Sequence, residues 1–216
     1  MIPSGIGRSC MGRYDTRMPI DPATLDADPV RQLDAWLGEA SAADVPLPNA
    51  FALATADDEG SPSVRYVLLN GLDAEGLRYF THRGSRKGRD VAINPAAAAA
   101  FWWPALDRQV RVSGSVRLLS EADSLAYWRT RPRGSQLSAT ISAQGQEVAS
   151  RGELEVRVAE LAARQSGELA LPPMWGGYLI VPRTFEFWES RADRLHDRVE
   201  YRRGGDGSWH SRRLQP

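Results

Sequence analysis

Residues 191–198, with the sequence RADRLHDR, gather side chains that could bind an anionic or electron-rich ligand. In an extended strand the side chains alternate between two faces, so Arg194, His196 and Arg198 would share one face while Asp197 would lie on the other. We expect Asp197 to pair there with a neighbouring arginine. Two guanidinium groups beside an imidazole would combine fixed positive charge with a group that can exchange a proton. The alternative is a solvated edge strand whose charges discourage aggregation.

A second basic cluster, RGSRKGRD, lies at residues 83–90. Ser85 is suited to cap a helix, which would place Arg86 and Lys87 in the first helical turn. Backbone N–H groups, the positive end of the helix dipole and two cations would then converge in a phosphate site. Lys87 is the single lysine among 27 basic residues, which favours a site that needs a compact ammonium group. The alternative is a helix that carries its cations at the unfavourable end.

The third cluster is YWRTRPRGSQ, at residues 127–136. Tyr127 and Arg131 are four residues apart, so a helix would present both on one face, and Ser135 follows the proline that stops the helix. A hydroxyl, a guanidinium and a second hydroxyl could surround another phosphate. The alternative is an ordinary helix end, where arginines bind the last carbonyl groups. Trp188 could flank a ring, although aromatic residues in strands usually belong to the core.

Other kinds of site find little support in the motifs. The three histidines have no metal-ligand spacing and Cys10 has no cysteine partner, so we expect neither a metal site nor a disulfide framework. The chain has no GxxxxGK[ST] loop and no GxSxG elbow, so a P-loop nucleotide site and a catalytic serine of that type are excluded.

The composition indicates a globular protein with a local rather than a global charge preference. The chain has 216 residues, 42% of them hydrophobic, and its 27 basic residues balance 27 acidic ones. A balanced chain offers no general attraction to nucleic acid or to an anionic membrane, so we expect neither as a partner. Neither a signal-peptide core nor an apolar run long enough to span a membrane occurs in the sequence, and we expect a cytoplasmic protein.

Periodicity predicts the elements that position these clusters. Helical spacing is expected over residues 27–45, capped by Asp28 and with an apolar stripe that should cover one side of a core: Val30, Leu33, Trp36 and Leu37. Helices are also expected over residues 84–95, 120–132 (opened by Ser120 with Asp123), 135–146 and 150–165. Strands at 50–57, 63–70 and 77–82 should form a three-stranded meander, followed by strands at 96–104 and 108–120 and by four closing strands at 178–182, 184–190, 193–203 and 209–214. Strands at both ends with helices between them favour a mainly β, α+β fold, an antiparallel barrel with peripheral helices. We expect one domain, residues 28–216, after an irregular, flexible N-terminal arm, residues 1–27.

Eight motifs together resemble one known family, and they occur in the same order along nearly the whole chain from Asp28. They are RYVLLN, YFTHRGSRKGRD, RQVRVSG, YWRTRPRGSQ, MWGGY, FEFWES, RLHDRVEY and the terminal RRLQP. This set resembles the pyridoxine (pyridoxamine) 5′-phosphate oxidase family. The resemblance implies an antiparallel split β-barrel and a homodimer with two FMN sites at the subunit interface, built from both chains.

The resemblance also implies which residues form the site. FMN contacts would fall on Arg65, Tyr66, Val67, Leu68, Leu69, Asn70, Phe80, Thr81, Arg86, Lys87, Gln109, Gln144, Gly145, Trp188 and Arg198. Substrate contacts would fall on Tyr127, Arg131, Ser135, Arg194, Leu195 and His196, of which Arg194 and His196 would be the catalytic pair over the pyridine ring. The three basic clusters then correspond to the flavin phosphate, the substrate phosphate and the reaction face.

Two departures from the family pattern affect the expected activity. Asn70 stands where a lysine typically reaches the substrate phosphate, and Gly145 stands where a serine or similar hydroxyl usually follows the glutamine. The arm, with Arg13 and Tyr14, only weakly resembles the family's substrate-covering segment. Loss of one charged hydrogen bond would weaken phosphate binding roughly tenfold or more.

The implied activity is that of a pyridoxal 5′-phosphate synthase in vitamin B6 metabolism. Pyridoxine or pyridoxamine 5′-phosphate would be oxidised by FMN, and O2 would take up the electrons as hydrogen peroxide. Asn70 keeps open a related flavin oxidase of the phenazine-biosynthesis type, although RPRGSQ retains the phosphate-binding arginine and serine. A non-catalytic split-barrel protein that binds FMN or pyridoxal phosphate is the third alternative, and the intact RLHDR motif argues against it.

Overall fold

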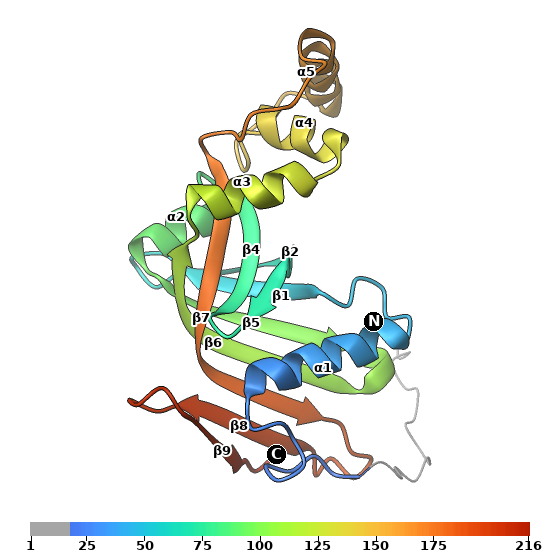
Figure 1. Cartoon of the computed structure of the whole chain (residues 1–216), viewed down its shortest axis with the longest axis vertical. Helices are drawn as coiled ribbons and strands as arrows, with labels where there is room; N and C mark the ends of the chain where they lie inside the picture. The colour runs from blue at the N-terminus through green and yellow to red at the C-terminus, as the bar shows by residue number, and fades with distance from the viewer. Residues whose placement is uncertain (1–17) are drawn as a thin grey trace, which may run out of the picture. The chain divides into compact units, whose positions relative to one another are not determined.

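The computed structural model of the chain describes residues 18–216 (Figure 1). Its helices are α1 (Pro29–Ala42), α2 (Arg86–Ile93), the short 3-10 helix η1 (Pro104–Leu106), α3 (Glu121–Thr130), α4 (Arg133–Ile141) and α5 (Arg151–Arg164). Its strands are β1 (Ala50–Ala56), β2 (Pro62–Leu68), β3 (Gly71–Asp73), β4 (Gly76–His82), β5 (Ala96–Trp103), β6 (Arg108–Leu118), β7 (Trp175–Glu189), β8 (Asp197–Arg203) and β9 (Trp209–Arg213). The expectations for Cys10, Arg13, Tyr14 and most of the predicted arm fall on residues 1–17, outside the described residues.

Local capping determines where the helices begin. The Asp28 carboxylate accepts the Val30 N–H at 2.9 Å, and Ser120 Oγ accepts the Asp123 N–H at 3.0 Å. Ser85 caps α2 in the same way, through the N–H of Gly88. All three predicted caps are confirmed, because each depends on residues only two or three positions apart.

The strands join in the order β2-β1-β5-β6-β7-β4-β3, with β8 between β7 and β9. The pairs β1–β2, β1–β5, β3–β4, β4–β7, β7–β8 and β8–β9 are antiparallel. The predicted meander is therefore wrong in one pairing: β4 lies against the distant β7 and the short β3, and not against β2. Strand periodicity reveals that a segment is extended but carries no information about a partner 100 residues away.

The prediction of four closing strands is also wrong. The two strands predicted at 178–182 and 184–190 are one strand, β7, which ends at Glu189 and pairs with β4 through Ile180 and with β8 from Thr184. Pro182 lies where β7 changes partner, so its missing N–H removes no rung from either of these ladders. The third closing strand, β8, begins only at Asp197, four residues later than predicted.

The described residues form two compact units, and the long strands β5, β6 and β7 contribute to both. Among the described residues, the first unit comprises residues 18–48, Phe101–Arg111 and Thr184–Pro216, and the second comprises Asn49–Ala100 and Val112–Arg183. The single domain predicted for residues 28–216 stays a prediction.

The core of the first unit forms around α1. The predicted apolar stripe is buried, with Trp36 only 2% exposed and Leu33 fully buried. The Trp36 ring meets Phe187 and Trp103 edge to face, at centroid distances of 5.1 and 6.4 Å. The Arg108 guanidinium lies 4.5 Å from the centre of the same ring. The stripe thus fixes α1 against strand residues of its own unit.

In the second unit, α3, α4 and α5 lie near one end of strands β4 and β7 (Figure 1). Trp128, Leu137, Leu169 and Trp175 form a buried cluster between them. The Trp128 indole N–H donates to the Leu169 carbonyl at 2.7 Å, so its polar group is satisfied in the core. This cluster fixes the end of α3 and the start of β7, which carry the candidate site.

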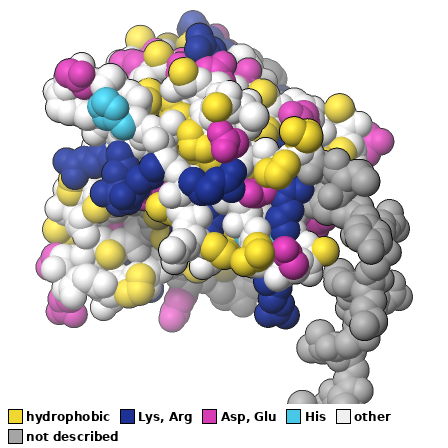
Figure 2. Space-filling view, turned by 90° about the horizontal axis from the view of Figure 1, so that it is seen from below, with side chains coloured by type: hydrophobic (Ala, Val, Ile, Leu, Met, Phe, Trp, Pro, Cys, Tyr) yellow, Lys and Arg dark blue, Asp and Glu magenta, His cyan; other side chains and the backbone are white. Residues whose placement is uncertain are grey.

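Basic and acidic side chains are interspersed on the part of the surface that Figure 2 draws. The face in Figure 2 shows several groups of basic side chains with acidic side chains among them. On β8 and β9, Arg202 and Arg212 both bond to Glu200, at 2.7 and 2.8 Å. No helix in the described part of the chain is long and apolar enough to cross a membrane.

Gly76 is a position where the fold requires glycine. Its φ is +141°, and an added Cβ would lie 1.9 Å from the Ile180 carbonyl oxygen. We expect Gly76→Ala to lower the free energy of unfolding by about 2 to 3 kcal/mol, because the β4–β7 backbone must move apart. Differential scanning calorimetry should show a fall in Tm of about 5 to 10 °C.

Gly38→Ala in α1 is the matched control. An added Cβ there meets nothing within 4 Å. Alanine favours a helix over glycine, so Tm should stay level or rise slightly. Equal falls in Tm for both variants would contradict the steric explanation.

Candidate active site

The predicted site residues fall into two sets, one in each unit. The second unit contains the set from Arg65 to Ser135 except Gln109, together with Gln144 and Gly145. The first unit contains Gln109, Trp188, Arg194, Leu195, His196 and Arg198. Each set is described within its own unit.

Lys87 forms the centre of the predicted phosphate site at the start of α2. Its side chain is buried, 8% exposed, and its ammonium lies 3.2 Å from Ser85 Oγ and 3.0 Å from Gln144 Oε1. Thr81 Oγ1 donates to the same Gln144 oxygen at 3.1 Å. Burial, with a smaller contribution from the Arg65 guanidinium, lowers the pKa of Lys87 to about 8. A buried cation whose hydrogen bonds go to neutral oxygens is an electrostatic fit for an anion.

Arg65, by contrast, has a carboxylate partner. Its guanidinium donates to Thr55 Oγ1 at 2.7 Å and to Ser63 Oγ, and Asp90 Oδ2 lies 4.0 Å away. Asp90 is itself buried and accepts hydrogen bonds from the Thr55 and Ser63 hydroxyls at 2.6 and 3.2 Å. Burial lowers the pKa of Arg65, while Asp90 acts in the opposite direction. Arg65 is thus held rigidly on β2, and sequence reasoning missed the Asp90 that holds it.

The rest of the predicted flavin segment follows the strand alternation of β2. Tyr66 and Leu68 point outward, 75% and 42% exposed, whereas Val67 is half-buried and Leu69 is buried. In this part of the segment, backbone atoms and inward side chains are therefore the groups available toward the interior of the second unit.

Arg86 does not share the environment of Lys87. Its side chain is 54% exposed, and its guanidinium lies 4.0 Å from the Asp57 carboxylate. The two cations are adjacent in sequence but project differently from the first turn of α2. Of these two cations, only Lys87 has a buried side chain at the predicted phosphate site.

A pocket of about 450 Å³ brings the predicted flavin and substrate residues together in the second unit. Its walls include Phe80, Thr81 and Gln144 from the flavin set and Arg131 and Ser135 from the substrate set. It is also lined by residues that sequence reasoning did not select: His82, Gly134, Ser138, Ala139, Ser142 and Trp175. Ser135, Ser138 and Ser142 recur at helical spacing along and just after α4, a pattern that could have predicted a polar helix face.

A stack of aromatic rings forms one wall of this region. Phe80, Tyr127 and Trp175 form a group of near-parallel rings, with centroid distances of 3.9 Å from Phe80 to Tyr127, 5.5 Å from Phe80 to Trp175 and 6.1 Å from Tyr127 to Trp175. The Arg131 guanidinium lies 4.9 Å from the centre of the Trp175 ring, and its NH2 group donates to the Ser135 carbonyl at 3.2 Å. Arg131 Nε is buried without a hydrogen-bond partner among the described residues. A planar cation with an unused donor thus lines the pocket.

The spacing from Tyr127 predicted that Arg131 lies in the last turn of the helix. The structure shows that it does not. The helix ends at Thr130, and Arg131 has an extended backbone, with φ −72° and ψ 141°. Pro132 explains this, because proline disfavours a helical conformation in the residue before it. The stack nonetheless brings Tyr127 and Arg131 to the same indole ring of Trp175.

Asn70 occupies the position of the expected lysine and binds the tyrosine of the substrate set. Its side-chain Nδ2 donates to the Tyr127 hydroxyl oxygen at 2.7 Å. Because this bond uses a lone pair of the tyrosine oxygen, the hydroxyl proton stays available for a ligand. The Asn70 side chain therefore adds orientation but no charge.

Two further details concern the flavin set. Gly145 has φ +90°, a backbone conformation that favours glycine over the serine of the family pattern. His82 lines the pocket, and burial, with a smaller contribution from Lys87, lowers the pKa of its imidazole. The histidine is therefore biased toward its neutral form.

In the first unit, the rings of His196 and Trp188 lie close together. Their ring centroids are 4.8 Å apart. The ring centroid of Trp102, which lies on β5, is 6.0 Å from that of Trp188. Arg198 Nε donates to Glu186 at 2.8 Å, and this bond raises the pKa of Arg198. Gln109 is half-buried at the start of β6.

The prediction that Arg194, His196 and Arg198 share one face of a strand is wrong for Arg194 and His196, because β8 begins at Asp197 and only Arg198 lies in it. Residues 191–196 form a turn before β8, and Arg194 adopts a left-handed backbone with φ +64°. Its neighbour Leu195 is 67% exposed. The expectation for Asp197 is confirmed, because its carboxylate pairs with Arg191 and Arg213, each at 2.6 Å.

Comparison with protein families gives two matches that together cover most of the chain. A family model described as pyridoxamine 5′-phosphate oxidase matches residues 37–165. A second, described as the pyridoxine 5′-phosphate oxidase C-terminal dimerisation region, matches residues 175–216.

Curated relatives align over nearly their full length. The pyridoxine/pyridoxamine 5′-phosphate oxidase of Ralstonia pickettii (strain 12J) is 49% identical over 200 residues, covering 93% of this chain and 94% of the relative. The protein of the same name from Rubrobacter xylanophilus is 47% identical over 218 residues, covering 100% of both.

Solved structures share the fold. PhzG from Burkholderia lata 383, in complex with tetrahydrophenazine-1-carboxylic acid, matches with a TM-score of 0.88 at 33% identity, covering 95% of this chain and 100% of that one. A pyridoxamine 5′-phosphate oxidase-related, FMN binding protein from Nostoc punctiforme matches with a TM-score of 0.70 at 20% identity, covering 89% of this chain and 100% of that one. The predicted fold class, a mainly antiparallel split barrel with peripheral helices, is confirmed.

Proposed function

Because the chain belongs to the pyridoxamine 5′-phosphate oxidase family, we propose that it is an FMN-dependent oxidase that converts pyridoxine or pyridoxamine 5′-phosphate to pyridoxal 5′-phosphate. The electron acceptor in this proposal is O2. The observation that carries it is the placement of two cations, neither bonded to a carboxylate in the described part of the chain: Arg131 lines the pocket, and the buried Lys87 bonds to Gln144, which lines the same pocket. Two phosphorylated ligands, cofactor and substrate, require two such cations.

The described residues fit FMN on two counts. The Lys87 ammonium supplies a desolvated positive charge for the flavin phosphate, with the N-terminus of α2 beside it. Thr81 and Gln144 add neutral groups to the same network. In the proposal, FMN is held by the flavin set from Arg65 to Gly145, together with Trp188 and Arg198.

FMN, when bound, would supply the redox chemistry by taking a hydride from substrate C4′ and passing the electrons to O2, which would leave as hydrogen peroxide. With pyridoxamine 5′-phosphate, water would then release the amine as ammonia and leave the aldehyde. The residues of this chain hold the substrate and move its protons. Arg131, Ser135 and the free proton of the Tyr127 hydroxyl would bind the substrate phosphate. His196 and Arg194 would lie over the pyridine ring, where a cation stabilises charge that develops near C4′.

The proposal includes a homodimer. The family model that matches residues 175–216 is described as a dimerisation region, which supports a homodimer. FMN sites at the subunit interface, with residues from both chains, would bring the two sets of site residues into use together. A cytoplasmic location is part of the same proposal.

Oxidation of a phenazine precursor is the second candidate function. Asn70 removes a cation from the substrate site, and the similar structure of PhzG was solved with a tetrahydrophenazine carboxylic acid. Arg131 and Ser135 favour the phosphorylated substrate over this alternative. A protein that binds FMN or pyridoxal phosphate without turnover is the third.

A substrate panel separates these functions. The protein purified in air should be yellow, release FMN on denaturation, and convert pyridoxamine 5′-phosphate to pyridoxal 5′-phosphate. Tetrahydrophenazine-1-carboxylic acid should be oxidised more slowly, if at all. Faster oxidation of the phenazine acid would replace the proposal by the second function, and bound FMN without turnover of either would leave the third.

Asn70→Lys tests the departure from the family pattern. We expect KM for pyridoxamine 5′-phosphate to fall about tenfold, because the lysine adds a charged hydrogen bond to the phosphate. Unphosphorylated pyridoxamine should show no gain. Asn70→Ala is the control for the loss of the Tyr127 hydrogen bond, and an unchanged KM in Asn70→Lys would show that position 70 does not reach the phosphate.

A further inference from the structure

The segment that joins β7 to β8 carries the proposed catalytic pair, Arg194 and His196. A buried carboxylate lies at each end of this segment. Glu189 and Asp197 are directly opposite each other in the β7–β8 ladder. Glu189 is fully buried and Asp197 is 6% exposed. Like charges opposite each other in a ladder repel, so this pairing needs a cation between them.

Arg191 is that cation. Its Nε donates to Asp197 Oδ2 at 2.6 Å, and its NH2 group lies 2.9 Å from Glu189 Oε1. Arg108 pairs with the other oxygen of Glu189 and Arg213 with the other oxygen of Asp197, each at 2.6 Å. Charges therefore alternate through the cluster, with Arg191 at its centre and its side chain only 11% exposed.

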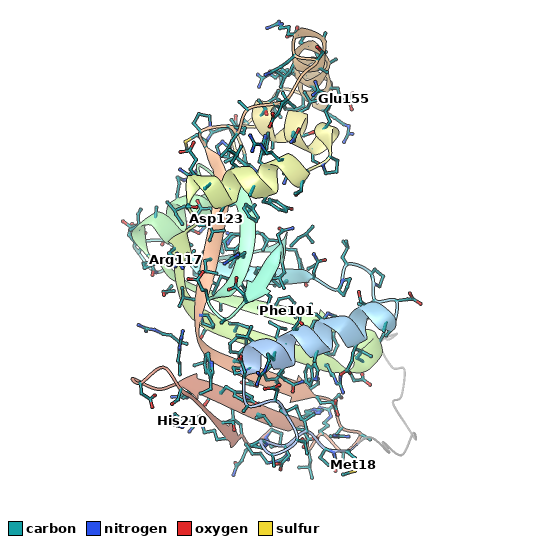
Figure 3. All side chains as sticks on the ribbon, viewed as in Figure 1. Met18, Phe101, Arg117, Asp123, Glu155 and His210 are labelled. Atoms are coloured by element: carbon teal, nitrogen blue, oxygen red, sulfur yellow. The ribbon has the colours of Figure 1, made fainter. Side chains whose placement is uncertain are left out.

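The cluster also fixes the first described residues of the chain. The Arg191 NH2 group donates to the Met18 carbonyl at 3.1 Å, and Arg213 NH2 donates to the Ile20 carbonyl at 2.8 Å. Figure 3 labels Met18 near the turn that follows β7. One guanidinium thus ties the turn to both strands and to a segment distant in sequence.

The backbone of Arg191 acts on His196. Its N–H donates to His196 Nδ1 at 3.0 Å. A backbone N–H can only donate, so Nδ1 must present a lone pair, and the neutral imidazole carries its proton on Nε2. The Arg191 carbonyl accepts the Arg194 N–H at 3.1 Å, which closes the turn in which Arg194 has φ +64°.

We propose that Arg191 is a positioning residue for the reaction. Its guanidinium holds the turn closed across Glu189 and Asp197, and the closed turn fixes His196 as an Nε2 donor and orients Arg194. This role rests on the proposed function, since it matters for catalysis only if Arg194 and His196 face the substrate. Nothing in RADRLHDR revealed it, because the partners of Arg191 lie on two strands and at residue 18.

The first test measures the tautomer of His196 without any turnover. The chain has three histidines, so ¹⁵N spectra of histidine-labelled holoprotein can be assigned by comparison with His196→Gln. At about pH 8.5, where imidazoles are ordinarily neutral, His196 should carry its proton on Nε2. Arg191→Gln should convert this signal to a mixture of tautomers, whereas Arg202→Gln on the same hairpin should not.

The second test measures kinetics with pyridoxamine 5′-phosphate. Arg191→Gln should lower kcat about tenfold with little change in KM or in FMN content, because the phosphate contacts are untouched. Arg191→Lys keeps the positive charge but loses the planar guanidinium, which can bond two carboxylates at once. Its kcat should therefore lie between those of the wild type and Arg191→Gln. It also serves as the test variant if Arg191→Gln fails to fold.

The outcomes separate the two proposals. An unchanged His196 tautomer together with an unchanged kcat would overturn the role of Arg191, and so would equal effects of Arg191→Gln and Arg202→Gln. A wild-type protein that does not oxidise pyridoxamine 5′-phosphate would overturn the proposed function, while the tautomer measurement would still decide whether Arg191 fixes His196.

Discussion

Replacing Arg131 with alanine should lower kcat/KM for pyridoxamine 5′-phosphate about 100-fold or more, mainly through KM. Arg131 lines the pocket with its guanidinium over Trp175, and its buried Nε has no hydrogen-bond partner in the described part of the chain. Two charged hydrogen bonds to one phosphate are worth about 3 kcal/mol or more, which corresponds to this factor.

Three comparisons make this result specific. Arg131→Lys should lose about tenfold, because an ammonium keeps the charge but loses the bidentate geometry. Arg129→Ala on the same helix should have no effect, because that arginine is 61% exposed and pairs with Glu168 at 3.0 Å. With unphosphorylated pyridoxamine, Arg131→Ala and wild type should be nearly equal. Equal losses with both substrates would place Arg131 away from the phosphate.

Replacing Lys87 with methionine should weaken FMN binding by about 10- to 100-fold. The ammonium is buried and bonds to Ser85 and Gln144, so the lost charge cannot be replaced by solvent. A charged hydrogen bond contributes about 1.5 to 3 kcal/mol, and methionine fills nearly the same volume. Quenching of FMN fluorescence on titration into the apoprotein gives Kd directly.

The pH dependence of that Kd provides a second signature. Burial lowers the pKa of Lys87 to about 8, so in the apoprotein the ammonium is charged below that pH and loses its proton above it. Because the phosphate binds the charged form, Kd should rise with pH above about 8, by up to tenfold per pH unit, until the pKa of Lys87 in the complex is reached. Lys87→Met should abolish this rise.

Arg164→Met is the control for charge alone. This arginine lies on α5, is 76% exposed and pairs with Glu160. The Kd of Arg164→Met for FMN and its pH dependence should match those of the wild type, because solvent screens an exposed charge. A pH profile that is the same in Lys87→Met and wild type would assign the titration to another group.

The parts of the fold that could be predicted from the sequence are those decided locally. Ser85 capped its helix as predicted, and the Trp36 stripe is buried, because each depends on residues within one or two turns. The partner of β4 could not be predicted, since strand pairing joins residues about 100 positions apart. The prediction of a strand break at Pro182 is wrong for a similar reason, because β7 continues through this residue as it changes partner.

The same distinction applies to the site. Lys87, Arg131 and Ser135 could be selected because basic residues and hydroxyls cluster in short motifs, and the structure places Arg131 and Ser135 on one pocket wall. Asp90 and Arg191 were missed because their importance arises from buried partners on other elements. The prediction that Arg194 lies in a strand is wrong. Its left-handed turn depends on the pairing of Glu189 with Asp197 across the β7–β8 ladder, which the charged motif does not reveal.

The most direct test of the central claim is the stoichiometry of a single reaction in air. Holoprotein purified with its flavin is mixed with pyridoxamine 5′-phosphate, and pyridoxal 5′-phosphate, oxygen consumption and hydrogen peroxide are measured together. We predict equal amounts of aldehyde formed, oxygen consumed and peroxide released, over many turnovers. A protein that retains FMN but forms no pyridoxal 5′-phosphate would contradict it.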